Sequence, residues 1–490
     1  MIKGKPTLFT LNELAGQLAA RPLPFCQRLD PETQVTGVSI DSRRLRPGEL
    51  FVALAGARFD GHDFIDQAVS RGATAVVFAA QKRSFSDLSQ RYPGVFWLPV
   101  ADPLAALGSL ARAWIKRVGP RVIAVTGSNG KSTTKEMLAH ILAPHFRVHK
   151  TAGNYNNRIG LPLTLFAMPE DCEVVVLEMG MSEPGEIADL AALATPEIAI
   201  LTGVAAAHLQ GLGSLAAVAQ AKCEIMTGLK NGGSLVYDAD DPWLGRMVPA
   251  LAAEPSAACF KLLPVSWYGA TEAVVRVSEI WLTPEGFSFV LSQDSLRETV
   301  GLSLWGRHNV KNAALAAAAA LLLPGMTPAL VAESLKHFKN LSGRLQCYPL
   351  AGGGLLVHDA YNANPASLEA ALTAVAERGG RRYLALVLGD MKELGPESAE
   401  LHRQMGRRLA EIRPDLVVLL GEEVEGMAVS ARNAGLPGDR IRQFPAGAQV
   451  EAFNFLRRRL PKAPLILVKG SRALALEKLV EPMLDFFETV

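Results

Sequence analysis

A glycine-rich segment holds the residues best suited to phosphate chemistry. The apolar run Val122-Ile123-Ala124-Val125 leads into Thr126-Gly127-Ser128-Asn129-Gly130-Lys131-Ser132-Thr133. Glycines let backbone N–H groups turn toward phosphate oxygens, and a following helix start adds a favourable dipole. In such a loop the lysine reaches the β- and γ-phosphates, and the next hydroxyl holds Mg²⁺. The segment therefore predicts a nucleotide-binding loop.

This loop departs in one place from the usual phosphate-loop pattern. A G-x-x-x-x-G-K-[ST] motif would have glycine at position 125, where this chain has valine, and the first glycine is Gly127. The alternative is a plain glycine turn between a strand and a helix, with Lys131 in solvent. The order of strand, loop and helix favours nucleotide binding.

A carboxylate ends a second buried run. Glu178 follows the apolar residues 174–177, and ligands of parallel sheets bind where the strands end. Because Mg²⁺ prefers oxygen ligands, we expect Glu178 to hold a second metal ion or its water. An exposed acid at the end of a strand is the plainer alternative, and the nearby phosphate loop favours the metal.

Alternating strands and helices are predicted to position these residues. Buried strands are expected at 122–125, 174–177, 198–202 and 235–237, with helices over 104–118, 187–193 and 216–229. Such alternation predicts a mostly parallel sheet. Residues 274–304 alternate as antiparallel strands do, and the alanine-rich segment after Asn312 is predicted to be a helix.

The pattern differs on either side of this region. Short strand candidates broken by turns lie at 34–40, 49–54 and 73–78, with a helix over 64–70. Further strand candidates, separated by helices, lie at 355–357, 383–388, 416–420 and 464–468. We therefore expect an α/β protein of three domains. These are a small mixed α/β domain (1–103), a central P-loop ATPase domain with a mostly parallel sheet (104–340) and a Rossmann-like domain (341–490).

Composition excludes several classes of protein. The 490 residues are 49% hydrophobic and 20% charged, and a net charge of +2 gives no broad field for nucleic acid or anionic membranes. Five cysteines without a C-x-x-C pair predict neither a disulfide framework nor a zinc site. The longest apolar run, 313–323, is too short for a membrane span of about 20 residues. We expect a cytoplasmic protein with no transmembrane segment and no nucleic-acid partner.

Motifs along nearly the whole chain resemble the Mur ligases, ATP-dependent enzymes that form amide bonds in peptidoglycan precursor synthesis. The phosphate loop is similar to that family's T-G-[ST]-[NS]-G-K-[ST]-[ST] loop. Further matching segments are Leu177–Gly180, Ala207–Gln210, Ala221–Ile225, Gly306–Ala313 and Gly343-Arg344. Within the family, four segments resemble the ligase that uses D-alanyl-D-alanine: Gly153–Thr164, Asp359–Pro365, Leu388–Gly395 and Val468–Arg472.

The resemblance implies a reaction and its cofactors. ATP phosphorylates the carboxylate of a UDP-N-acetylmuramoyl-tripeptide, the amine of D-alanyl-D-alanine attacks the acyl phosphate, and ADP and phosphate are released. This activation is required because a free carboxylate is a poor acyl donor. Lys131 and two Mg²⁺ ions are expected to stabilise the transferring phosphoryl group. A monomer is expected.

The resemblance also implies a set of catalytic and metal-binding residues. Lys222 matches a lysine that CO₂ converts to a carbamate, which supplies anionic oxygens to the second Mg²⁺. His208 matches a histidine near that metal. The expected metal ligands are Ser132, Glu178, His208 and Lys222, and the catalytic residues are Lys131, Lys222, His208 and Glu178. From spacing alone, a packed histidine and a solvated lysine would be the simpler interpretations.

Nucleotide contacts are implied in two domains. Besides residues 126–133, Asn309 and Asn312 are expected to meet adenine, since three residues apart on a helix places them on one face. Arg344 is expected to face phosphate and Asp359 the ribose, with the third domain closing over the nucleotide. The alternatives are a helix cap for Asn309 and an interdomain ion pair for Arg344 or Asp359.

Substrate contacts are implied in all three domains. Ser42 and Arg43 suit a diphosphate, while His62 and Asp63 either read the uracil or support their loop. The remaining assignments are Asn156, Asn157 and Arg158 to the muramoyl-peptide, and Asn364, Ser471 and Arg472 to the dipeptide. The runner-up functions are another Mur ligase, a folylpolyglutamate synthetase, a P-loop ATPase module without ligation and a non-catalytic scaffold.

Overall fold

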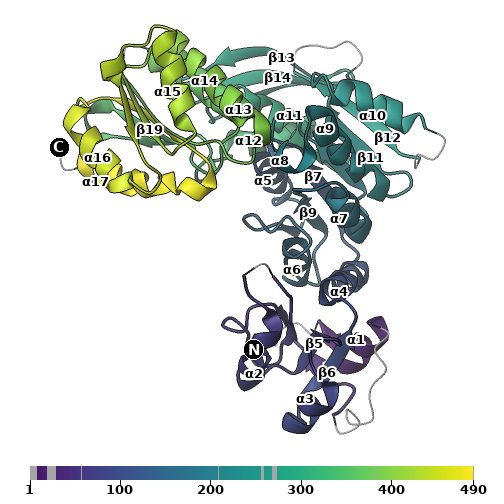
Figure 1. Cartoon of the computed structure of the whole chain (residues 1–490). Coiled ribbons are helices and arrows are strands. Elements are labelled where there is room, and N and C mark those ends of the chain that lie inside the picture. Colours follow the sequence, from purple (N-terminus) through teal and green to yellow (C-terminus); the bar gives the residue numbers. More distant parts are fainter. Residues whose placement is uncertain are drawn as a thin grey trace.

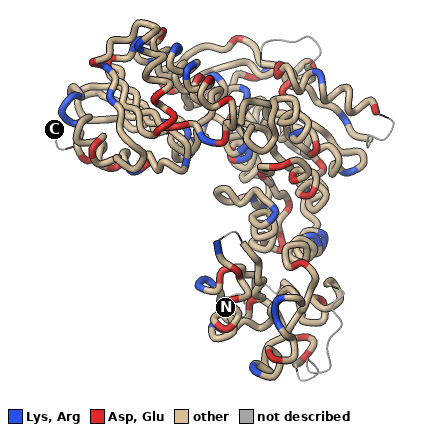
Figure 2. The backbone as a smooth tube through the Cα atoms, in the orientation of Figure 1, with Lys and Arg blue, Asp and Glu red and all other residues tan. Residues whose placement is uncertain are grey.

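Three α/β domains follow one another along the chain (Figure 1), as the sequence predicts. The computed structural model describes residues 8–18, 29–56, 58–207, 209–254, 259–267, 273–380 and 382–488. In Figure 1 the first domain lies below the central domain, and the third domain lies beside the central domain. Acidic and basic residues are interspersed over all three domains (Figure 2), in line with the near-neutral net charge. No helix in the described part of the chain is both long and apolar enough to cross a membrane.

The first domain has two small sheets. A parallel sheet orders β3 (Val38–Ser39), β4 (Leu50–Val52), β5 (Ala75–Ala79) and β6 (Phe96–Val100), and β1 (Phe9–Thr10) pairs antiparallel with β2 (Gln34–Val35). Its helices are α1 (Leu11–Gln17), η2 (Gly61–Phe64), α2 (Ile65–Ser70) and α3 (Phe85–Arg91). The run predicted as one strand over 34–40 is split between the sheets. Gly37 lies at the break, where a Cβ would come within 2.9 Å of the Glu49 side chain.

A nine-stranded sheet forms the central domain, in the order β15-β14-β13-β12-β11-β10-β7-β9-β8. The parallel part runs from β8 to β13, and β14 and β15 are antiparallel, as predicted for 274–304. The strands are β7 (Arg121–Thr126), β8 (Val148–Lys150), β9 (Val174–Glu178), β10 (Ile198–Leu201), β11 (Ser234–Asp238), β12 (Lys261–Ser266), β13 (Val275–Leu282), β14 (Phe287–Gln293) and β15 (Leu296–Leu302).

Helices cover both faces of this sheet. Alternate residues of β7 face opposite cores: Ile123 and Val125 pack with α5 and α11, whereas Val122 and Ala124 pack with α4 and α7. This period-two alternation between two buried faces explains the continuous apolar strands. The helices are α4 (Pro103–Val118), α5 (Lys131–Leu142), α6 (Gly160–Phe166), α7 (Glu186–Ala194), α8 (Leu209–Leu212), α9 (Leu215–Cys223), η3 (Glu224–Gly228), α10 (Leu244–Ala252), α11 (His308–Ala320) and α12 (Pro328–Lys336).

The third domain is a six-stranded sheet in the order β16-β17-β21-β18-β19-β20, parallel except for β16. The four predicted strands correspond to β17 (Leu355–His358), β18 (Leu384–Gly389), β19 (Leu416–Leu420) and β21 (Leu465–Lys469). Two edge strands were not predicted, β16 (Gln346–Pro349) and β20 (Ile441–Phe444), because edge strands are half-exposed and carry polar residues. The helices are α13 (Pro365–Gly379), η5 (Gly395–Glu397), α14 (Ser398–Ile412), α15 (Val424–Asn433), α16 (Gln449–Arg459) and α17 (Val480–Glu488), with short 3₁₀ turns η4 (Ala351–Gly353), η6 (Gly438–Arg440), η7 (Arg472–Leu474) and η8 (Leu476–Leu479).

Packing crosses both predicted domain boundaries. Helix α4 contacts α1 and β5 of the first domain and α6 and α7 of the central domain. Trp305, which precedes α11, is buried in the core of the third domain. The cut points at 103 and 340 therefore stay predictions, because each falls within a packed junction.

Candidate active site

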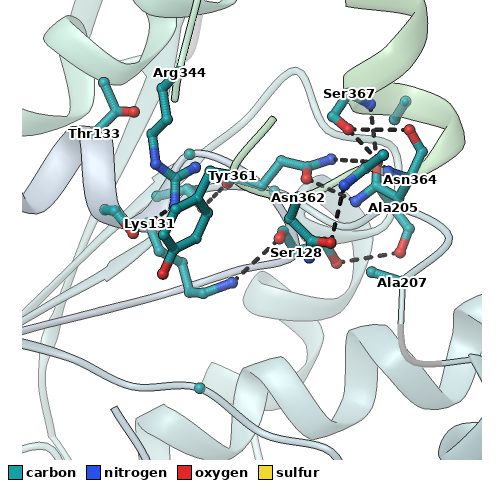
Figure 3. A pocket seen from close by; sticks show the side chains of 18 of the residues that line it. Ser128, Lys131, Thr133, Ala205, Ala207, Arg344, Tyr361, Asn362, Asn364 and Ser367 are labelled. Carbon is teal, nitrogen blue, oxygen red and sulfur yellow. Dashed lines mark hydrogen bonds between the residues drawn. The ribbon is translucent and has the colours of Figure 1, made fainter. Parts of the chain in front are cut away.

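A cavity of about 840 Å³ lies between the central and third domains, where β7, β9 and β10 end (Figure 3). The central domain contributes residues 128–133, the loop after β8, Glu178 and the start of α11. The third domain contributes residues around 343–345, 359–364 and 469–473. Parallel strands thus present their carboxyl ends to a shared hollow, the usual ligand position in such sheets.

The phosphate loop has the backbone geometry that its glycines allow. Gly127 (φ 144°) and Gly130 (φ 86°) occupy the left-handed half of backbone space, and a Cβ on either would collide with Thr202 Oγ1 or Asn312 Oδ1. Lys131 opens α5, and its Nζ donates to the carbonyl oxygens of Gly127 (2.7 Å) and Ser128 (3.2 Å). The ammonium therefore lies against the loop that would hold phosphates. Burial lowers the pKa of Lys131, and the carboxylate of Glu178 opposes that shift.

Glu178 lies at the end of β9 with one oxygen unused. Its side chain is 3% exposed, and its N–H donates to Thr151 Oγ1 (2.9 Å). Oε1 accepts from Asn156 Nδ2 (2.8 Å), whereas Oε2 is buried without a hydrogen bond, 3.7 Å from Lys135 Nζ. Because a buried carboxylate oxygen is normally satisfied, this atom is available to a cation.

Lys222 is a second buried group without a partner. It lies in the last turn of α9, is 1% exposed, and its Nζ has no hydrogen bond. Burial holds the pKa of Lys222 well below its usual value, and the charge of Lys131 adds to the shift, against the carboxylates of Glu224, Glu186 and Glu178. This shift favours the unprotonated amine, which is the form that reacts with CO₂. His208, predicted beside this metal, lies outside the described residues.

The third domain touches the phosphate loop at two points. Arg344 Nη2 donates to Ser132 Oγ (2.9 Å), and its guanidinium lies 4.3 Å from the centre of the Tyr361 ring. The amides of Asn129 and Asn364 exchange hydrogen bonds of 3.2 and 2.8 Å. Figure 3 shows Arg344, Tyr361 and Asn364 together around Lys131 and Ser128. Arg344 thus lies beside the phosphate loop, and its contact with phosphate stays a prediction. The amide of Asn364 is hydrogen-bonded to the phosphate loop itself.

The other predicted nucleotide residues are largely engaged within the protein. Asp359 accepts from Lys469 Nζ (2.7 Å) and the Leu345 N–H (3.0 Å), so it forms an ion pair within the third domain. Asn309 donates to Trp305 O (2.7 Å), and Asn312 donates to Asn309 Oδ1 (3.1 Å). Only Asn312 Oδ1 remains without a partner, although both asparagines line the cavity.

Polar residues of the third domain form the opposite wall. Ser471 Oγ accepts from the Lys392 N–H (2.8 Å), and Lys392 Nζ lies 2.8 Å from both Asp390 and Glu423. Arg472 is exposed and pairs with Glu477 at 3.3 Å. Lys392, Ser471 and Arg472 line the cavity, and the dipeptide contacts of Ser471 and Arg472 stay predictions.

The loop after β8 is held by its own side chains. Asn157 Oδ1 accepts from the N–H groups of Ile159 (3.1 Å) and Gly160 (2.8 Å), so it caps the start of α6. Arg158 pairs with Asp189. Asn156 and Asn157 line the cavity, whereas Arg158 is not among its lining residues.

The predicted uridine residues lie in the first domain, outside the cavity lining (Figure 1). Ser42 Oγ donates to Gln67 Oε1 (2.6 Å), and the exposed Arg43 forms a bidentate pair with Asp41 at 2.9 Å. His62 Nε2 accepts from the Ala79 N–H (2.9 Å), so Nδ1 carries the proton and donates to Asp60 (2.6 Å). Both ring nitrogens are used, and Asp63 pairs with Arg83 at 2.9 Å. These bonds favour loop support for His62 and Asp63.

Family models match most of the chain. They are described as "Mur ligase family, catalytic domain" (residues 34–115), "Mur ligase middle domain" (125–320) and "Mur ligase, glutamate ligase domain" (343–472). A UDP-N-acetylmuramoyl-tripeptide--D-alanyl-D-alanine ligase of Bacillus subtilis is 36% identical, over 93% of this chain and 94% of that protein. The chain belongs to the Mur ligase family.

Solved structures place this Mur ligase among the MurF-like members. MurF from Acinetobacter baumannii matches with a TM-score of 0.85 and 28% identity, over 97% of this chain and 99% of that one. MurF from Thermotoga maritima in complex with ADP matches with a TM-score of 0.78 and 29% identity, over 92% and 98%. The three-domain arrangement of this Mur ligase is therefore that of MurF.

Three site residues of this Mur ligase escaped the sequence reasoning. Lys135 lies 2% exposed beside Glu178 and donates to Thr151 O (2.6 Å), and Tyr361 lies under Arg344. Lys392 lines the cavity beside Ser471. Tyr361 and Lys392 lie inside segments that carried the family resemblance, and Lys135 lies one helical turn after Lys131. Their position in or next to these motifs was the sequence feature that could have identified them.

Proposed function

We propose that this Mur ligase joins D-alanyl-D-alanine to UDP-N-acetylmuramoyl-tripeptide in peptidoglycan precursor synthesis, using ATP and releasing ADP and phosphate. One observation carries the proposal. A single cavity brings Lys131 and Glu178 of the central domain near Arg344, Lys392 and Ser471 of the third. The names of the full-length relatives support the substrates, and the ADP complex of a structural relative supports the nucleotide.

The phosphate loop is suited to transfer of the terminal phosphoryl group of ATP. Lys131 already points its ammonium at the loop carbonyls, so its reorientation toward phosphate oxygens needs only a rotation of the side chain. Arg344 approaches from the other side, and Tyr361 supports the guanidinium plane. Both cations stabilise negative charge on the phosphoryl group while the tripeptide carboxylate attacks phosphorus and ADP departs.

Mg²⁺ fits the residues present. Ser132 and Glu178 line the cavity and carry oxygen atoms that suit Mg²⁺, and Oε2 of Glu178 has no hydrogen bond. His208 is the predicted third ligand. We further propose that the amine of Lys222 adds to CO₂ and loses a proton, which gives a carbamate. The carbamate oxygens would use the buried position where Nζ now lies without a partner. When bound, the metal ions supply charge neutralisation to the phosphates.

The third domain is suited to hold the dipeptide. Lys392 and Arg472 offer positive charge to its carboxylate, and Ser471 lies between them on the wall. In this position the free amine of the dipeptide can attack the acyl carbon, after which the C–O bond to phosphate breaks and the amine loses a proton. Asn156 and Asn157 line the cavity, which supports a role for them in contacting the tripeptide.

The first domain is proposed to bind the uridine diphosphate group. Arg43 is exposed and carries a fork of donors that suits phosphate, with Asp41 as its resident partner. His62 and Asp63 would then stabilise the loop rather than touch uracil.

Phosphate release from ATP tests the proposed function. We expect release only when UDP-muramoyl-tripeptide and D-alanyl-D-alanine are both present, with stoichiometric formation of the pentapeptide. Turnover with a single free amino acid, and none with the dipeptide, would refute it.

A further inference from the structure

Helix α13 of the third domain is anchored to the central domain at both ends. Its N-cap residue, Asn364, pairs with Asn129 of the phosphate loop. Its last turn lies against the turn between β13 and β14, and Figure 1 shows α13 at the junction of the two domains. At about 1.5 Å per residue, the two anchors are about 20 Å apart.

Arg378 forms the anchor at the far end. Its Nη1 donates to Pro284 O (3.0 Å), and its Nη2 donates to Thr283 O (3.2 Å) and to Gly286 O. The guanidinium lies 5.0 Å from the ring centre of Trp305 and 5.5 Å from that of Phe287. All five partners belong to the segment predicted as the central domain, although Trp305 is buried in the core of the third. Three hydrogen bonds and two ring contacts thus join this one side chain to that segment.

The contact depends on geometry more than on charge. Within the part of the chain that the structure describes, the hydrogen bonds of Arg378 go to backbone carbonyl oxygens, and the neighbouring acid, Glu377, accepts from Arg307 Nε at 3.0 Å. Burial lowers the pKa of Arg378. A planar fork that stacks on rings and bonds several carbonyls cannot be reproduced by lysine. The anchor therefore specifies one orientation of α13 on the central domain.

We propose that Arg378 is a positioning residue for ligation, which holds the third domain where Arg344 and Asn364 reach the phosphate loop. This role rests on the proposed function. The helix is rigid, so a tilt of about 10° at Arg378 would move the far end by about 3.5 Å over about 20 Å. That displacement exceeds what the 2.8 Å bond between Asn364 and Asn129 tolerates. Arg378 thus acts on the site without touching a substrate.

The test compares R378Q and R378K with R382Q as a matched control. Arg382 is exposed and, like Arg378, lines a second hollow between these two domains, distinct from the cavity at the phosphate loop. We expect kcat/KM for ATP to fall about tenfold in R378Q and less in R378K, because the competent orientation is less populated. Binding of UDP-muramoyl-tripeptide, measured by calorimetry, should stay unchanged, as should all constants of R382Q. Small-angle X-ray scattering should give a larger radius of gyration for R378Q than for the wild type.

Three results would overturn the proposal. One is unchanged kcat/KM and scattering in R378Q. The second is a loss of UDP-substrate binding in parallel with a lower melting temperature, which would mark a merely structural role. The third is a wild-type kcat/KM in R378K, which would show that a positive charge at position 378 is sufficient without the guanidinium geometry. The scattering comparison needs no substrate, so it tests the anchor even if the wild type fails to ligate these substrates.

Discussion

Replacement of Lys222 by methionine should stabilise the fold while it removes activity. The side chain is 1% exposed, and its Nζ has no hydrogen bond. A buried polar group without a partner costs about 1–3 kcal/mol, and methionine fills a similar volume without that group. We therefore expect K222M to raise the free energy of unfolding by about 1 kcal/mol, or the melting temperature by about 2–4 °C.

Lys135 offers a matched control in the same domain. It is also buried, at 2% exposure, but its Nζ donates to Thr151 O (2.6 Å) and lies 3.1 Å from Glu136 Oε1. Removal of one partner of a buried ion pair typically costs about 3–5 kcal/mol, so K135M should lower stability. Two lysine-to-methionine changes are thus expected to act with opposite signs.

Calorimetric unfolding in metal-free buffer depleted of CO₂ measures these stabilities, and phosphate release measures activity. We expect K222M to be inactive, and short carboxylic acids to restore part of the activity of K222A by supplying an anionic oxygen. The reasoning is refuted if K222M loses stability as K135M does, or if K222A retains undiminished activity.

Three further predictions concern residues that line the cavity. Burial lowers the pKa of His308 to about 4 from 6.5. The stability of the fold is therefore unaffected by this group above pH 6.5 and declines by roughly 3 kcal/mol as the pH falls toward 4, because the unfolded chain binds the proton first. Urea unfolding of H308N should show a flatter pH profile in that range. R344A should raise KM for ATP about tenfold with less effect on UDP-substrate binding, and R344K should recover only part of it, because lysine lacks the fork; equal KM values in all three proteins would contradict this. N364S keeps an N-cap for α13 but loses the amide hydrogen bonds to Asn129. The losses of kcat/KM in N364S and N129A should therefore not add in the double variant, with a coupling energy of about 1 kcal/mol between the two positions. Simple additivity of the two losses would argue against a functional role for the Asn129–Asn364 pair.

Strong periodicity made the sheets of the second and third domains predictable. Buried strands such as Val174–Glu178 are apolar on both faces and end at turns. The prediction of a single strand over 34–40 was wrong because the alternation of apolar and polar residues continues across Gly37, where the chain passes from one sheet to the other. Edge strands such as Ile441–Phe444 carry too little apolar pattern to stand out.

Local motifs located the phosphate loop and Glu178, since each follows directly from a strand end. They could not show which side chains bind each other instead of a ligand. Asp359 pairs with Lys469, 110 residues away in sequence, and Asn364 pairs with Asn129, 235 residues away. Such pairings depend on how domains pack, which sequence spacing does not encode. Sequence spacing likewise does not show that Lys222 is buried with no hydrogen bond to its Nζ.

Transfer of oxygen from the tripeptide carboxylate to phosphate is the direct test of whether ATP activates this carboxylate before an amine attacks it. With ¹⁸O in the terminal carboxylate of UDP-muramoyl-tripeptide, we expect one labelled oxygen in each phosphate released, detected by mass spectrometry. Unlabelled phosphate, formed alongside the amide product, would contradict the account.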